Sequence, residues 1–120
     1  QDKKILRTYD EQKRLLAQET VSWHYTSDAK GRTSVKSRTG RILYDYSGLG
    51  GSSLPDRSYY EDGVLRIQTA WQSPSAYTET LLFDGGYSVR TSYENRVKTL
   101  EIILLNGKEM RRRTFENEML

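Results

Sequence analysis

Residues 59–66, Tyr-Tyr-Glu-Asp-Gly-Val-Leu-Arg, indicate the fold of this chain because the same pattern recurs along it. Each copy has a large apolar or aromatic residue, an acidic residue or Asn, usually a glycine, and then an alternating run. The other copies are residues 82–90, 92–100 and 104–111, with a weaker one at 8–15. Asp-Gly and Asn-Gly favour the positive φ angles of tight hairpin turns, and period-2 alternation marks half-buried strands. The sequence therefore predicts an all-β chain, an antiparallel β-meander of short hairpins that forms an open twisted sheet or a partly closed barrel.

Alternation within these copies assigns side chains to the two faces of the sheet. After Gly63, one face is expected to carry Leu65, Ile67, Thr69 and Trp71. After Gly86, one face is expected to carry Tyr87, Val89, Thr91 and Tyr93. Residues 111–115 are expected to be the last strand, whose arginines protect an exposed edge from pairing with other chains.

The N-terminal part, residues 1–56, has a looser pattern than the hairpin-rich part, residues 57–120. Ile5 to Glu19 favours strands over an amphipathic helix, and residues 20–25 and 42–46 predict short strands. Residues 28–40 predict a hairpin or a loop around 34–36, and residues 47–56 predict a loop. We expect one domain over residues 1–120, because neither side of that loop has enough apolar residues to fold alone.

Composition excludes several classes of protein. The chain has 120 residues, a net charge of +3 and no cysteine. The absence of cysteine excludes disulfide frameworks and thiolate metal sites. No apolar run approaches the roughly 20 residues of a membrane-spanning helix. A compact domain of this mass would expose roughly 6,700 Å² and bury about two thirds of its extended surface around one core.

Enzyme signatures are scarce in this sequence. Its one histidine, His24, alternates with Trp23 and Tyr25 and is expected to occupy an ordinary strand position. There is no phosphate-binding glycine loop and no metal-ligand spacing. We therefore predict a protein without enzymatic activity, catalytic residues, cofactor or metal site.

Aromatic and basic side chains are the best candidates for binding. Most aromatic residues are expected to supply the core in place of aliphatic ones, and the others to form a face suited to a glycan, a peptide or a partner protein. Nucleic acid is not the expected partner, because 16 acidic residues leave a modest net charge. The predicted binding residues are Tyr59, Tyr60, Trp71, Tyr87, Tyr93, Arg111, Arg112 and Arg113.

The repeated stretches resemble known repeats. Residues 60–66 and 106–112 (Asn-Gly-Lys-Glu-Met-Arg-Arg) resemble the bacterial MORN-type variant repeat, and residues 8–16 resemble a YD repeat of the Rhs family. The resemblance covers mainly residues 57–116, and residues 94–96 (Glu-Asn-Arg) lack its turn glycine. It implies an extended or curled antiparallel sheet that serves as a scaffold or binding surface, without catalytic machinery.

These observations predict a non-enzymatic binding or scaffold module that contacts a partner protein or glycan through an aromatic and basic sheet face. The resemblance and the start at Gln1 rather than Met lead us to expect an exported bacterial protein, either periplasmic, a lipoprotein or at the cell surface, with a cytoplasmic location as the alternative. Exposed sheet edges suggest a homodimer by edge pairing. The alternative function is a small lipocalin-like barrel that binds an apolar ligand in a pocket lined by Trp23, Trp71 and tyrosines.

Overall fold

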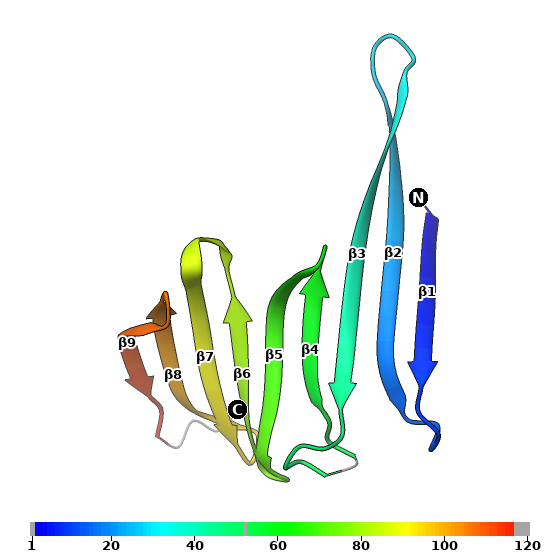
Figure 1. Cartoon of the computed structure of the whole chain (residues 1–120). Coiled ribbons are helices and arrows are strands. Elements are labelled where there is room, and N and C mark those ends of the chain that lie inside the picture. The colour runs from blue at the N-terminus through cyan, green and yellow to red at the C-terminus, as the bar shows by residue number, and fades with distance from the viewer. Residues whose placement is uncertain (1, 52, 117–120) are drawn as a thin grey trace.

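The chain folds into a single layer of antiparallel strands (Figure 1). The computed structural model describes residues 2–51 and 53–116. The strands are β1 (Asp2–Tyr9), β2 (Leu15–Ser27), β3 (Thr33–Asp45), β4 (Asp56–Glu61), β5 (Val64–Ser73), β6 (Ala76–Leu82), β7 (Tyr87–Glu94), β8 (Val97–Leu105) and β9 (Lys108–Thr114). Their order in the sheet is their order in the chain, so the predicted all-β antiparallel meander is confirmed. The sheet is open: β1 and β9 are its two edges, and it does not close into a barrel.

Tight turns close the hairpins of the C-terminal half. Asp62-Gly63 has φ angles of 49° and 81°, and Asn106-Gly107 has 52° and 81°. Two successive positive φ angles define the type I′ turn, whose twist matches that of the flanking strands. Asn95-Arg96 adopts the same conformation, with φ angles of 51° and 67°, although it has no glycine. The remaining copy differs, because Asp84–Gly86 forms a short 3₁₀ turn.

Two other hairpins share a five-residue turn, one within the weaker copy at residues 8–15 and the other at residues 28–32. In the β1–β2 turn, Asp10 Oδ1 accepts the backbone N–H of Arg14 at 2.8 Å, and Asp10 Oδ2 accepts the Arg14 Nε–H at 2.8 Å. In the β2–β3 turn, Asp28 makes the same two bonds with Arg32, at 2.9 and 2.8 Å. The aspartate thus hydrogen-bonds the backbone that it turns, and the arginine four residues later holds it in place.

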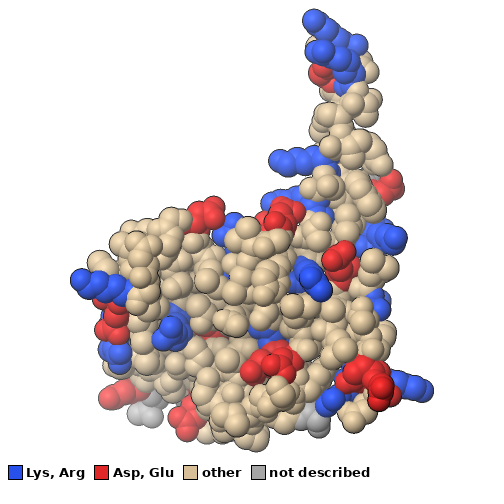
Figure 2. Space-filling view, in the orientation of Figure 1, with Lys and Arg blue, Asp and Glu red and all other residues tan. Residues whose placement is uncertain are grey.

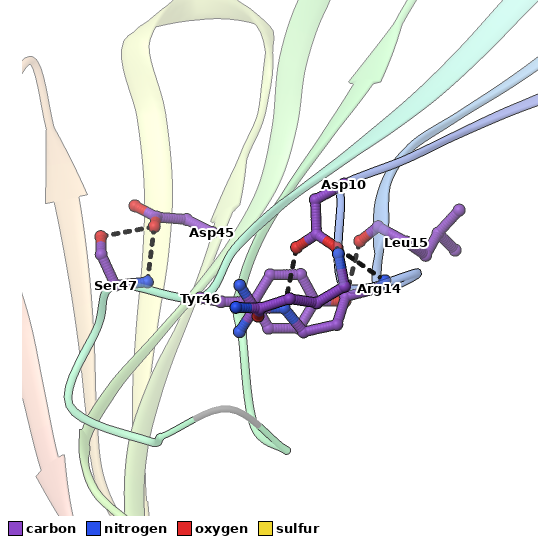
Figure 3. A network of polar contacts seen from close by, with 7 residues as sticks. Asp10, Arg14, Leu15, Asp45, Tyr46 and Ser47 are labelled. Atoms are coloured by element: carbon purple, nitrogen blue, oxygen red, sulfur yellow. Dashed lines mark hydrogen bonds and ion pairs between the residues drawn. The ribbon is translucent and has the colours of Figure 1, made fainter.

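The first of these turns also contacts the end of β3 (Figure 3). The Tyr46 hydroxyl donates to the Leu15 carbonyl oxygen at 2.8 Å, and the Arg14 guanidinium carbon lies 4.5 Å from the centroid of the Tyr46 ring. Cation–π contact and a hydrogen bond therefore join the β1–β2 hairpin to the start of the β3–β4 loop.

The N-terminal part is more regular than expected. Ile5 to Glu19 forms strands, as predicted, and residues 20–25 lie within β2. The turn of the second hairpin lies at residues 28–32 and not around 34–36, because Asp28 and Arg32 close it. Residues 42–46 do not form a separate short strand but include the end of β3. The predicted loop at 47–56 separates β3 from β4, with Ser52 outside the described residues.

One expected face was wrong. A β-bulge between β4 and β5 pairs Tyr60 with Leu65 and Tyr59 with Ile67. The extra residue, Arg66, interrupts the alternation, so Leu65 lies on the opposite face from Ile67. The face expected for β7 is confirmed by its register with β6.

The single layer leaves little interior. The accessible surface is 9019 Å², against roughly 6,700 Å² for a compact domain of this mass. The radius of gyration is 18.5 Å, whereas a compact chain of this length has about 13.6 Å. Within the described residues, Ile102 and Leu104 are the only buried hydrophobic side chains. The expectation of an enclosed core was therefore wrong, because half-buried side chains on the sheet faces replace it.

Replacing Arg96 by glycine is expected to stabilise the protein. Arg96 holds a left-handed conformation that glycine adopts without steric cost, so Arg96→Gly should raise the free energy of unfolding by about 1 kcal/mol. Arg90→Gly, the same change inside strand β7, should lower it by about 1 kcal/mol. Chemical denaturation of both variants measures this difference, and a loss of stability in Arg96→Gly would contradict it.

The two aspartate turns predict a loss of stability in acid. Hydrogen bonds from the backbone and side chain of Arg14 lower the pKa of Asp10, and those from Arg32 lower the pKa of Asp28, each against an ordinary value of 3.8. A lowered folded-state pKa stabilises the fold above pH 3.8, and this stabilisation disappears as the pH falls below 3.8 through the folded-state values. The melting temperature should fall less between pH 7 and pH 3 in Asp10→Asn/Asp28→Asn than in the unsubstituted chain. An equal fall in both proteins would show that these turns do not sense pH.

Candidate binding face

Strand register places side chains in rows that cross the sheet. Residues directly opposite each other in antiparallel strands lie on the same face, so each row follows from the pairing. One face, which we call the aromatic face, carries three such rows over β3–β9. Its apolar row is half-buried and consists of Ile42, Tyr59, Ile67, Leu81, Val89 and Ile103, with Arg111 next in line on β9.

The next row is charged at its ends and at two internal positions. It consists of Arg57, Thr69, Glu79, Thr91, Glu101 and Arg113. Thr69 and Thr91 are only 4% and 8% exposed, although within residues 2–51 and 53–116 no second layer covers this face. Each is a short side chain between longer neighbours in its own row and the adjoining rows, so the longer side chains shield it.

The third row is aromatic. Trp71 and Tyr77 have ring centroids 4.7 Å apart with planes inclined at 44°. Tyr77 and Tyr93 are stacked, with centroids 4.7 Å apart and planes at 14°. Lys98 pairs with Tyr93 on the next strand, and its Nζ lies 5.3 Å from the centroid of Phe115. The rings thus contact one another across β5, β6 and β7.

The β3–β4 loop covers the Trp71 end of the aromatic row. Asp56 Oδ1 accepts the backbone N–H of Trp71 at 2.8 Å. A Cβ atom at Gly50 would lie 2.8 Å from Trp71 Cγ and would clash with the Leu54 carbonyl oxygen. Glycine at position 50 therefore allows the loop to lie directly on the indole ring.

The environment of the aromatic row keeps its tyrosines protonated. Burial raises the pKa of Tyr77, and the neighbouring Tyr93 and Glu79 raise it further. Burial likewise raises the pKa of Tyr93, with added effects of Glu79 and Glu101. Both phenols are therefore neutral hydroxyl groups at physiological pH.

The structure divides the predicted binding residues between the two faces. Those on the aromatic face are Tyr59, Trp71, Tyr87, Tyr93, Arg111 and Arg113. Tyr60 and Arg112 lie on the opposite face, where Arg112 forms an ion pair with Glu109 at 2.7 Å. Tyr77, which joins Trp71 to Tyr93, was not among the predicted binding residues. The sequence contained a signal for this residue: a turn at Pro74-Ser75 places Trp71 and Tyr77 opposite each other on adjacent strands.

A shallow depression lies where the apolar and charged rows meet. Its volume is about 300 Å³, and Tyr59, Ile67, Thr69 and Glu79 are among the residues that line it. Both an apolar surface and a carboxylate are therefore available to a bound partner at this point.

The described part of the chain contains no group of three or more His, Asp or Glu side chains placed to hold a metal ion. Among its elements there is no helix long and apolar enough to cross a membrane. His24 is an exposed residue of β2. No protein-family model, curated protein or solved structure matches this chain.

The central ring of the aromatic row should stabilise the sheet. Tyr77→Leu keeps an apolar side chain but removes two aromatic contacts, each of which contributes about 0.5–1.5 kcal/mol. The free energy of unfolding should fall by about 1–3 kcal/mol. Tyr25→Leu is the control, at a position that is 51% exposed on the β2–β3 hairpin, which projects beyond the other strands (Figure 1). It should change the free energy of unfolding by less than about 0.5 kcal/mol. Similar losses in both variants would contradict a special role for the row.

Proposed function

We propose that this chain is a non-enzymatic binding module that receives a partner protein on its aromatic face. The observation that supports this is the apolar row, six half-buried side chains on a face that no second layer of the described residues covers. Soluble proteins rarely leave a continuous apolar surface open unless another molecule covers it. Tyrosine, tryptophan and arginine, which surround this row, are the residues that most often dominate binding energy at protein interfaces.

A partner protein fits this face better than the glycan that was the other expectation. A sugar ring stacks on the free face of an aromatic side chain, but here Tyr77 lies between Trp71 and Tyr93 at 4.7 Å from each. The apolar row, in contrast, offers an extended strip that can be covered by the apolar side chains of a protein surface. Arg57 and Arg113 at the ends of the charged row would fix the orientation of that surface.

The lipocalin-like alternative loses its structural basis. It required a closed barrel, and the sheet is open. It also required Trp23 and Trp71 to line one pocket, but Trp23 pairs with Ser37 on the face opposite to that of Trp71.

Three expectations stay proposals: the kinship with MORN-type or YD repeats, the exported bacterial location, and a homodimer through the sheet edges. For the homodimer, charge is the main obstacle. Both edge strands are exposed and basic, with Lys3, Lys4 and Arg7 on β1 and residues 111–113 on β9. Pairing of two such edges would bring like charges together.

Adjacent leucines on β6 provide the test of the proposed function. Leu81 belongs to the apolar row, and Leu82 is equally half-buried on the opposite face. The chain is immobilised and exposed to an extract of the organism that encodes it, and retained proteins are quantified by mass spectrometry. Leu81→Ser should reduce retention of the partner at least about tenfold, equivalent to about 1.4 kcal/mol, while Leu82→Ser should leave it unchanged.

A second matched pair controls for damage to the strand. Arg111→Gln changes the aromatic face and Arg112→Gln changes the opposite face at the next position. Only the first should weaken retention. Equal effects within either pair, or retention of glycans in place of proteins, would refute a protein partner on this face.

A further inference from the structure

A second depression lies on the aromatic face over β2 and β3, away from the aromatic row. One part, of about 270 Å³, is lined by residues that include Thr20, Gly40, Tyr59 and Glu61. Another part, of about 310 Å³, is lined by Ser22, His24, Lys36 and Arg38. Ser22 and Arg38 line both parts, so the two form one trough along the β2–β3 hairpin.

The floor of the trough is low because Thr20, Ser22 and Gly40 are small residues. On this face, Thr20 pairs with Gly40, and Ser22 pairs with Arg38 at the basic end. Glycine weakens a strand interior and often marks a close approach of another group. Here that group is Tyr59: a Cβ atom at Gly40 would lie 3.3 Å from the Tyr59 hydroxyl oxygen. The Tyr59 ring thus lies over Gly40 and borders a floor that Thr20 and Ser22 line with hydroxyl groups.

One end of the trough is strongly basic. Lys3, Ser22 and Arg38 form one row across β1, β2 and β3, and His24 pairs with Lys36 in the next row. Lys3 and Lys36 make no ion pair with any carboxylate of the described residues. Residues 24–38 carry four Lys or Arg side chains and one carboxylate, so their net charge of +3 equals that of the whole chain. Figure 2 shows Lys and Arg gathered on this projecting β2–β3 hairpin.

Contacts at the base of the hairpin hold Arg38 in position. Arg38 Nη2 lies 3.0 Å from Glu61 Oε1, and Arg38 Nε lies 3.9 Å from Asp62 Oδ2. Asp62 Oδ1 also accepts the backbone N–H of Thr39 at 2.8 Å. A guanidinium fixed in this way loses little conformational freedom when it binds an anion.

We propose that this trough binds a small sugar-like ligand that carries a phosphate or sulfate monoester. The ester lies at the basic end, where Lys36, Arg38 and Ser22 donate charge-assisted and neutral hydrogen bonds to its oxygens. The hydroxyl-bearing part lies along Thr20 beside Tyr59, and the Glu61 carboxylate accepts its hydrogen bonds. This site lies over β2 and β3 and adjoins the apolar row at Ile42 and Tyr59, whereas Leu81 on β6 lies outside it.

Titration calorimetry of the full chain tests the site. The probes are glucose 6-phosphate, glucose 6-sulfate, inorganic phosphate and glucose, at one fixed ionic strength. At least one ester should bind saturably with one site per chain and at least about tenfold more tightly than inorganic phosphate or glucose alone. The stronger of the two esters identifies the anion. Absence of saturable binding by both esters, or equal binding of inorganic phosphate, would overturn the proposal.

Two lysines of the same hairpin distinguish the site from general attraction of anions. Lys36→Gln removes a cation from the trough, and Lys30→Gln removes one from the tip turn at residues 28–32. Lys36 is exposed and outside the contacts that hold Arg38, so its replacement should leave the melting temperature unchanged. Lys36→Gln should weaken binding of the ester at least about tenfold, and Lys30→Gln by less than about twofold. Equal weakening in both variants would refute a defined site.

The Leu81→Ser variant should bind the ester normally. Failure of the partner-protein proposal and failure of the ester site can therefore be recognised independently.

Discussion

Hydrogen bonding between each strand and its sequence neighbours is the constraint on which this structure depends. Every ladder from β1–β2 to β8–β9 joins consecutive strands, and no second layer is present among the described residues to stabilise a misplaced one. Backbone pairing and side-chain contacts along each face therefore replace an enclosed core. Since each strand pairs with its neighbour in the chain, every hairpin closes only the loop between those two strands, and we expect fast folding for a β protein.

The rows of side chains are a consequence of that pairing. A one-residue slip between two strands would move every later side chain to the other face. The apolar row nevertheless continues from β3 to β8, because each register shift is confined to a local bulge. The same registers separate two kinds of surface on one face: aromatic and apolar over the central strands, polar and basic over β1–β3.

Local chemistry made much of the fold predictable from the sequence. Asp62-Gly63 and Asn106-Gly107 identified their turns, and the alternation from Tyr87 to Tyr93 gave the face of β7 correctly. The bulge at Arg66 was not predictable, because the residue that is left unpaired depends on how β4 and β5 align. The Asp28 turn was missed because its aspartate and arginine are four residues apart and no glycine follows the aspartate directly.

Site residues were harder to predict than strands. Tyr59 and Tyr60 were both candidates, and alternation alone could place them on opposite faces but could not say which face would collect the other aromatic residues. Tyr77 gains its importance from partners on two different strands, and the trough at Gly40 needs Tyr59 from a strand almost 20 residues later in the sequence. Such arrangements depend on non-local register, which a single sequence pattern does not contain.

The consecutive strand order also decides how the protein responds to mechanical force. A pull on β1 and β9, the two edges, loads the hydrogen bonds of an edge ladder one after another rather than together. The sheet should therefore unzip strand by strand at low force, releasing a length of chain with each hairpin. A module of this design yields gradually under tension and re-forms by the same local steps when the tension ends.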